Sequence, residues 1–98
     1  IWKPFFFIII FKSKEITKGT IDRSMISQRE IFVEALKCNA VNIVLVHNHP
    51  SGEPTPSRDD IRSTKKIKEA GDMVGIRLLD HIIIGDNKFS SLRELKVI

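Results

Sequence analysis

The sequence contains one cysteine, Cys38, and no tyrosine, and its apolar runs are short. A single cysteine excludes an intrachain disulfide and fits a reducing compartment, so we expect a cytoplasmic protein with Cys38 as a buried, inert thiol. The apolar run at residues 5–11 falls far short of the roughly 20 apolar residues that a membrane-spanning helix needs. It is followed by Lys12, Ser13 and Lys14 and not by a small-residue cleavage site. We therefore expect neither a membrane span nor a signal peptide.

With 98 residues, 42% of them hydrophobic and 29% charged, the chain has the composition of one folded domain, which we expect to span residues 1–98. Because the first residue is Ile1 and not Met, we expect the amino-terminal part to be truncated or divergent. The net charge of +4 permits an acidic partner such as nucleic acid but does not identify one. The densest basic group, Arg62, Lys65, Lys66 and Lys68, is expected to be a solvated helix face.

Runs of apolar, β-branched and aromatic residues predict the strands. The clearest strand is residues 41–47, and another is residues 76–84. The run at 5–11 is expected to be a strand buried on both faces. Shorter strands are predicted at 15–21, interrupted at Gly19, and at 89–92 after a turn at residues 85–88.

Two capping boxes predict where helices begin. Ser27 and Glu30 open a helix over about residues 28–38, whose inward face carries Ile31, Ala35 and Cys38. Ser57 and Asp60 open a second helix that continues to about Ala70, with Gly71 as its stop signal. On this second helix Ile61, Thr64 and Ile67 or Lys68 mark the helical spacing. Strands that alternate with helices indicate an α/β or α+β sandwich, with a central sheet flanked by helices.

His47 and His49 are two residues apart at the end of the clearest strand, so extended geometry sends both side chains to the same side. Asp60 falls in the first turn of the next helix, and the intervening loop is long enough to fold that turn back over the histidines. Two imidazoles and one carboxylate suit Zn²⁺ and leave its fourth position for water, as in catalytic zinc sites. Zinc lowers the pKa of its water to about 7, which gives a nucleophile that can attack a carbonyl.

Each half of this pattern also has a simpler explanation. A His-x-His pair at a strand end is more often exposed or a cap than a metal site. Ser-x-x-Asp is in itself an ordinary helix cap. Only the combination of the two is specific.

The combined pattern, His47-Asn48-His49-Pro50-Ser51-Gly52 followed by Ser57 and Asp60, resembles the JAMM motif, H-x-H-x(7)-S-x(2)-D, of the JAB/MPN metallopeptidase-like domains. The surrounding sequence over about residues 19–95 resembles the RadC branch of that family. It includes Arg29-Glu30-Ile31-Phe32, Ala35-Leu36, Asn39-Ala40, Asp80-His81-Ile82-Ile83-Ile84-Gly85-Asp86 and Ser91-Leu92.

The resemblance implies a mixed sheet flanked by helices, with the layering of cytidine deaminases. It implies a zinc hydrolase of peptide or isopeptide bonds, with His47, His49 and Asp60 as metal ligands and a protein or peptide as substrate. Ser57 is implied as the hydroxyl that stabilises the oxyanion formed on an amide carbonyl. For the RadC branch, DNA repair is only a label by association.

The family pattern also requires an upstream glutamate as general base and acid, just before the first apolar strand. Here Trp2, Lys3 and Pro4 stand at those positions, so the glutamate is absent or lies in a missing segment. Three other glutamates precede His47. Glu15 is an unfavoured candidate, Glu30 is explained by its capping box, and Glu34 by a solvated helix face.

Asp80 and His81 lie on a strand that we expect to neighbour the metal strand. His81 is either a buried hydrogen-bonded histidine, the simpler interpretation, or a residue that orients a metal ligand.

Other functions remain as alternatives. A metal-stabilised interaction module without catalysis fits the missing glutamate, and a DNA-associated protein fits the basic charge balance. Residues 47–49 read His-Asn-His, but the signature of HNH nucleases consists of residues dispersed over their fold and not of this tripeptide. Metallo-β-lactamases need an aspartate where Ser51 stands, and zinc deaminases need a Cys-x-x-C pair that this sequence lacks.

Overall fold

The computed structural model describes residues 5–12 and 27–98, together with the backbone of residues 15–19. The elements in chain order are β1 (Phe6–Lys12), β2 (Glu15–Gly19), α1 (Gln28–Lys37), β3 (Asn42–Asn48), α2 (Arg58–Val74), β4 (Arg77–Ile84) and β5 (Phe89–Ser91). The predicted strands and helices are therefore confirmed to within a few residues. The predicted extension of the second strand to residue 21, and the positions of Trp2, Lys3 and Pro4, lie outside the described residues.

The strands form one mixed, five-stranded sheet in the order β2-β1-β3-β4-β5. Among the described strands, only β3 and β4 run parallel, and α2 connects them, since a parallel pair requires a crossover. The antiparallel β1 places Phe6 opposite His47. The predicted α/β class with a central mixed sheet is confirmed.

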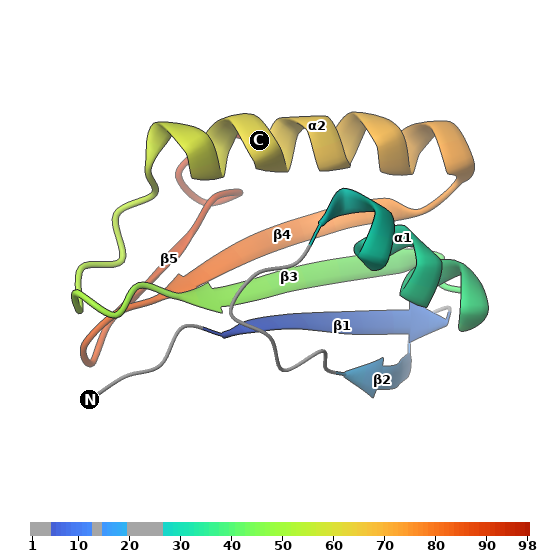
Figure 1. Cartoon of the computed structure of the whole chain (residues 1–98), viewed down its shortest axis with the longest axis horizontal. Coiled ribbons are helices and arrows are strands. Elements are labelled where there is room, and N and C mark those ends of the chain that lie inside the picture. The colour runs from blue at the N-terminus through green and yellow to red at the C-terminus, as the bar shows by residue number, and fades with distance from the viewer. Residues whose placement is uncertain (1–4, 13–14, 20–26) are drawn as a thin grey trace.

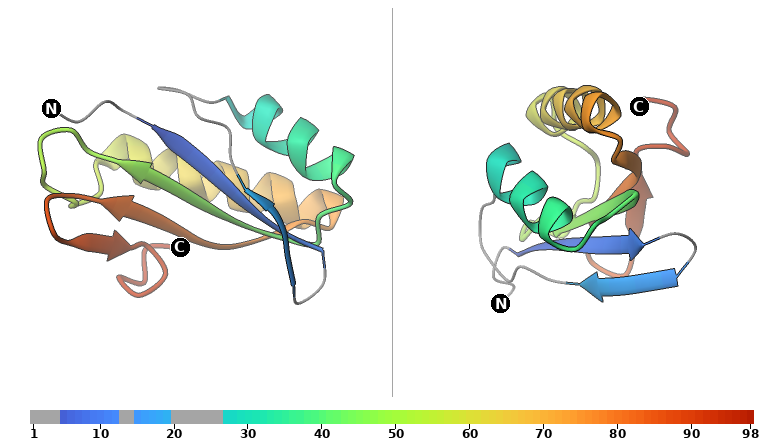
Figure 2. Two further views of the ribbon diagram at one scale, coloured as in Figure 1. Left: turned by 90° about the horizontal axis from the view of Figure 1, so that it is seen from below. Right: turned by 90° about the vertical axis from the view of Figure 1, so that its right-hand side faces the viewer.

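Both described helices lie on the same face of the sheet, as Figures 1 and 2 show from three sides. Side chains that alternate along the strands enter the core between sheet and helices. They pack with Ile31 and Ala35 of α1, as predicted, and with Ile67 of α2. The sheet contributes Ile8, Ile10, Ile43, Leu45 and Leu78, and Ala40 and Ile76 complete this core.

The other face of the sheet is apolar but is not covered by a described helix. Its side chains are half-buried and come from β1 (Phe7, Ile9), β3 (Val44, Val46) and β4 (Ile82, Ile84). The expectation that the strand at 5–11 is buried on both faces is therefore wrong, since only Ile8 and Ile10 of β1 are fully buried. Cys38 is half-buried and not buried, because it lies at the C-cap of α1, beyond the last inward-facing turn.

The second helix continues past Gly71, contrary to the expectation, and ends at Val74. Gly75 forms the C-cap in the left-handed conformation, with φ of 78°, which glycine adopts at little cost. Gly71 is instead needed for packing. A Cβ built there lies 2.2 Å from the carbonyl oxygen of Ile76, so this glycine allows the chain entering β4 to pass close to the helix.

Candidate metal centre

The end of β3 and the first turn of α2 bring His47, His49 and Asp60 together, as the sequence predicts. Nε2 of His47 lies 3.4 Å from Oδ1 of Asp60, and Nε2 of His49 lies 3.0 Å from Oδ2. One ligand atom from each residue falls within 4.8 Å of the others. His47 is buried, and the other two side chains are partly exposed, so the cluster is open to solvent on one side.

The orientation of His49 is fixed by the loop that follows it. Nδ1 of His49 lies 2.8 Å from the backbone carbonyl oxygen of Glu53. A carbonyl can only accept, so His49 donates from Nδ1–H. The other nitrogen, Nε2, then faces Asp60.

Asp60 belongs to the capping box that begins α2. Ser57 N–H donates to Oδ2 of Asp60 at 2.8 Å, and Asp60 N–H donates to the hydroxyl of Ser57 at 3.0 Å. Burial raises the pKa of Asp60, but interactions with His47 and with Ser57 N–H lower it by more, so this pKa lies well below its usual range. Asp60 is therefore a carboxylate at neutral pH.

The chemistry of these donors fits a metal ion. Two imidazole nitrogens face two oxygens of one carboxylate, and the carboxylate has no proton to donate at neutral pH. Such a group of lone pairs is stable only with a cation among them, which is a proton on an imidazole or a metal ion. Nitrogen and carboxylate oxygen in this ratio are the ligand types that zinc accepts.

Ser57 lies at the N-cap of α2, where its oxygen accepts from Asp60 N–H. The capping role is confirmed. Hydrogen bonding from the Ser57 side chain is also among the interactions that lower the pKa of Asp60, so the hydroxyl interacts with the carboxylate of this candidate ligand. The hydroxyl therefore caps the helix and lies beside the carboxylate of Asp60.

His81 lies on β4, which pairs with β3, the strand that carries His47. This pairing places His81 opposite Leu45. Its Nε2 lies 2.6 Å from Nδ1 of His47, and Phe6 stacks on the His47 ring with centroids 4.7 Å apart. His81 is thus a buried, hydrogen-bonded histidine, and it also contacts a candidate ligand. Asp80 has a structural role, since its carboxylate accepts from the hydroxyl of Ser91 and from Arg93 N–H.

Burial, and next the nearby charge of His47, lower the pKa of His81 to about 3. An unfolded histidine binds a proton below about pH 6.5, whereas folded His81 stays neutral to about pH 3, so lowering the pH across this window destabilises the fold. The upper limit is about 1.4 kcal/mol per pH unit. We expect the metal-free protein to lose about 1–2 kcal/mol of unfolding free energy between pH 7 and pH 5.

Urea unfolding in the presence of a chelator at pH 7, 6 and 5 measures this loss. His81→Gln, which does not titrate in this range, is the control and is expected to flatten the pH dependence. A wild-type stability that stays constant or rises as the pH falls contradicts the prediction.

The described part of the metal cluster contains no glutamate. The register of β1 and β2 places the backbone of Glu15 opposite Lys12, at the other end of β1 from Phe6, which pairs with His47. The six residue steps from Phe6 to Lys12 span roughly 20 Å. The candidate role of Glu15 as the base is therefore wrong, and Glu30 is confirmed in its capping box.

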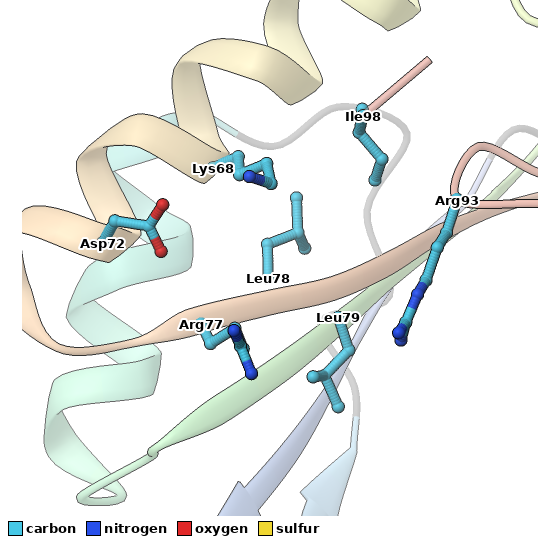
Figure 3. A pocket seen from close by; sticks show the side chains of 7 residues that line it. All are labelled: Lys68, Asp72, Arg77, Leu78, Leu79, Arg93 and Ile98. Carbon is cyan, nitrogen blue, oxygen red and sulfur yellow. The ribbon is translucent and has the colours of Figure 1, made fainter. Parts of the chain in front are cut away.

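A pocket of about 230 Å³ lies between α2 and β4, and none of the residues that line it belongs to the metal cluster. Figure 3 shows Lys68 and Asp72 on the helix, Arg77 on the strand, and Arg93 in the segment that follows β5. Three basic side chains and one carboxylate give this pocket a positive character. The helix residues Arg62, Lys65, Lys66 and Lys68 are exposed, as expected of a solvated face.

The mixed sheet, the crossover helix and a His-His-Asp cluster that could hold a metal ion are consistent with a domain of the JAB type. The chain matches the family model of the RadC-like JAB domain over residues 9–97 and belongs to that family.

Similar proteins include a UPF0758 protein of Clostridium perfringens, 55% identical over 89 residues, which are 91% of this chain and 39% of that protein. A UPF0758 protein of Clostridium beijerinckii is 52% identical over 86 residues, which are 88% of this chain and 38% of the relative. The chain thus spans about two fifths of the length of these relatives. Among the described helices, none is both long and apolar enough to cross a bilayer.

Three contributors to the site were not predicted from the sequence as parts of it. They are the carbonyl oxygen of Glu53, the ring of Phe6 and the hydroxyl of Thr64, which lies 2.7 Å from Nδ1 of His81. The sequence does give a clue to the role of Thr64, because it is a polar residue on the inward face of an amphipathic helix. A buried hydroxyl in that position needs a partner.

Proposed function

We propose that this domain is a zinc-dependent hydrolase of peptide or isopeptide bonds, with His47, His49 and Asp60 as the metal ligands. The observation that supports it most is the convergence of two imidazole nitrogens on one ionised carboxylate at 3.4 and 3.0 Å. The Nδ1–H of His49 is engaged by a carbonyl, which leaves its Nε2 as the nitrogen for a metal. The match to the RadC-like JAB family supports the same assignment.

A zinc ion bound there supplies a Lewis acid and lowers the pKa of a water molecule to about 7. The residues of the chain supply the positions of the reacting groups. Ser57 lies beside the Asp60 carboxylate at the edge of the cluster, and we assign to its hydroxyl the stabilisation of negative charge on the amide oxygen. The partly exposed side chains of His49 and Asp60 leave that side open to a substrate.

Zinc stoichiometry and hydrolysis together test this function. After loading with zinc and removal of the excess, we expect about one zinc per chain by mass spectrometry, none in His49→Ala, and the wild-type amount in Ser51→Ala. Ser51 is an exposed serine of the same loop and serves as the matched control. The loaded protein is expected to cleave a linear or isopeptide-linked peptide, and His49→Ala to lack this activity. A wild-type chain that holds no zinc contradicts the proposal.

A second candidate is a metal-stabilised interaction module without catalysis. It is favoured by the described part of the cluster, which lacks a glutamate that could act as base. Stoichiometric zinc with no cleavage of either kind of peptide would favour this module over the hydrolase. Zinc-dependent cleavage would exclude it.

A further inference from the structure

Two buried side chains that are not ligands join Asp60 to His47 behind the metal cluster. Thr64, on α2, and His81, on β4, have exposed fractions of 0% and 4%. Their contacts run from the backbone carbonyl of Asp60 to Thr64, from Thr64 to His81, and from His81 to Nδ1 of His47. These contacts link α2, which lies over one face of the sheet (Figure 1), to β4 and β3.

The direction of the first link follows from the atoms involved. The Thr64 hydroxyl lies 2.5 Å from the carbonyl oxygen of Asp60, and a carbonyl can only accept. The Thr64 hydroxyl therefore donates its one proton to the carbonyl oxygen of Asp60. At its second contact, 2.7 Å from Nδ1 of His81, the Thr64 oxygen must accept, so His81 donates from Nδ1–H.

The direction of the second link follows from the first. His81 is almost fully buried, and neither of its ring nitrogens contacts a carboxylate in the described part of the chain. Burial of an unpaired charge is costly, so the ring is neutral and carries one proton, on Nδ1. Its Nε2 is then an acceptor, and His47 donates to it from Nδ1–H across 2.6 Å.

We propose that Thr64 is a positioning residue that, through His81, holds the proton of His47 on Nδ1 and so presents Nε2 to the metal. This inference rests on the proposed metal site and extends it to two residues that bind no metal. Asp60 takes part twice, because its carboxylate faces His47 and its backbone carbonyl anchors Thr64. The ligand on β3 and the ligand on α2 are therefore connected behind the cluster by one continuous set of hydrogen bonds.

Removal of the Thr64 hydroxyl breaks this set. His81 then loses the acceptor for its Nδ1–H and can carry its proton on Nε2, facing Nδ1 of His47. His47 would accept there and move its own proton to Nε2, which is the nitrogen that the metal needs. Loss of a hydrogen bond that orients a metal ligand typically lowers metal affinity by 10–100-fold.

Thr64→Val and Thr64→Ser form the matched pair for the test, because valine keeps the shape of threonine and serine keeps the hydroxyl. We expect zinc affinity, measured by competition with a chelator, to fall about 10–100-fold in Thr64→Val and to stay within about threefold of wild type in Thr64→Ser. Urea unfolding of both metal-free variants separates this loss from a loss of fold. Equal zinc affinity in the two variants overturns the inference.

Long-range ¹⁵N–¹H NMR of the histidine rings in the metal-free wild type is an independent readout. We expect a protonated Nδ1 on His47, and on His81 a protonated Nδ1 with an unprotonated Nε2. An unprotonated Nδ1 on His47 overturns the inference even if zinc binds. A wild-type chain with these ring states but without zinc affinity would refute the metal site and leave the hydrogen-bond directions intact.

Discussion

Asp60→Asn is expected to weaken zinc binding at least about 100-fold while α2 keeps its first turn. The carboxylate of Asp60 supplies the only negative charge among the three candidate ligands, and an amide is a poor substitute in zinc sites, which use carboxylate, imidazole and thiolate. The amide oxygen of asparagine can still accept from Ser57 N–H, as Oδ2 of Asp60 does at 2.8 Å. The substitution therefore separates metal binding from helix capping.

Asp59→Asn is the matched control, because Asp59 precedes Asp60 in the same helical turn. Its side chain is 88% exposed and lies 3.8 Å from Arg62, away from the histidines. Chelator competition at neutral pH is expected to give wild-type zinc affinity for Asp59→Asn and a large loss for Asp60→Asn. If both variants bind zinc equally well, Asp60 is only a helix cap.

Gly71→Ala is expected to destabilise the fold by about 3 kcal/mol or more, the range of severe core disruption. In an ordinary helix interior the same change stabilises by about 1 kcal/mol, so the sign of the effect is informative. At Gly71 a Cβ lies 2.2 Å from the carbonyl oxygen of Ile76, and the obstacle is backbone, which cannot rotate away. The helix and the start of β4 have to separate.

Gly75→Ala provides the comparison. Gly75 has φ of 78°, but a Cβ there meets no atom within 4 Å. Alanine in this conformation costs about 1–2 kcal/mol. Urea unfolding of the metal-free variants is expected to give a much lower free energy of unfolding for Gly71→Ala than for Gly75→Ala. The reverse order would mean that the end of α2, and not its approach to β4, requires glycine.

These two glycines also show where prediction from the sequence succeeds and where it fails. The capping box at Ser57 and Asp60 is a local pattern, so the start of α2 was predicted to the residue. The sequence predicts that α2 ends at Gly71, because a glycine near the end of a helical pattern commonly terminates the helix. The actual reason for Gly71 is a contact with the backbone of Ile76, which arises only after the chain has folded back as β4.

The metal cluster was predictable because its parts are close in sequence. His47 and His49 share one side of a strand end, and Asp60 opens the next element, so spacing alone brings them together. The position of His81 was not predictable in this way. In the β3–β4 pairing Ile43 lies opposite Leu78, but the next residue, Val44, lies opposite Asp80. The register therefore shifts by one residue at this point.

That irregularity decides which side His81 faces. In a regular ladder Asp80, and not His81, would share the inner face with Leu78, since side chains alternate. The extra residue reverses the alternation and brings His81 toward Thr64 and His47. A pattern of apolar residues does not contain this information, which is why the sequence left two interpretations of His81 open.

If the proposed zinc site is occupied, the placement of the candidate ligands on β3 and α2, with hydrogen bonds extended to β4, would make the folded state depend on the supply of zinc. A ligand that binds only the folded state stabilises it by about 4 kcal/mol at 1,000 times its dissociation constant. That is a large share of the 5–15 kcal/mol by which domains are usually stable. Zinc depletion would then act on the abundance of the protein through proteolysis of its unfolded form, in addition to any effect on catalysis.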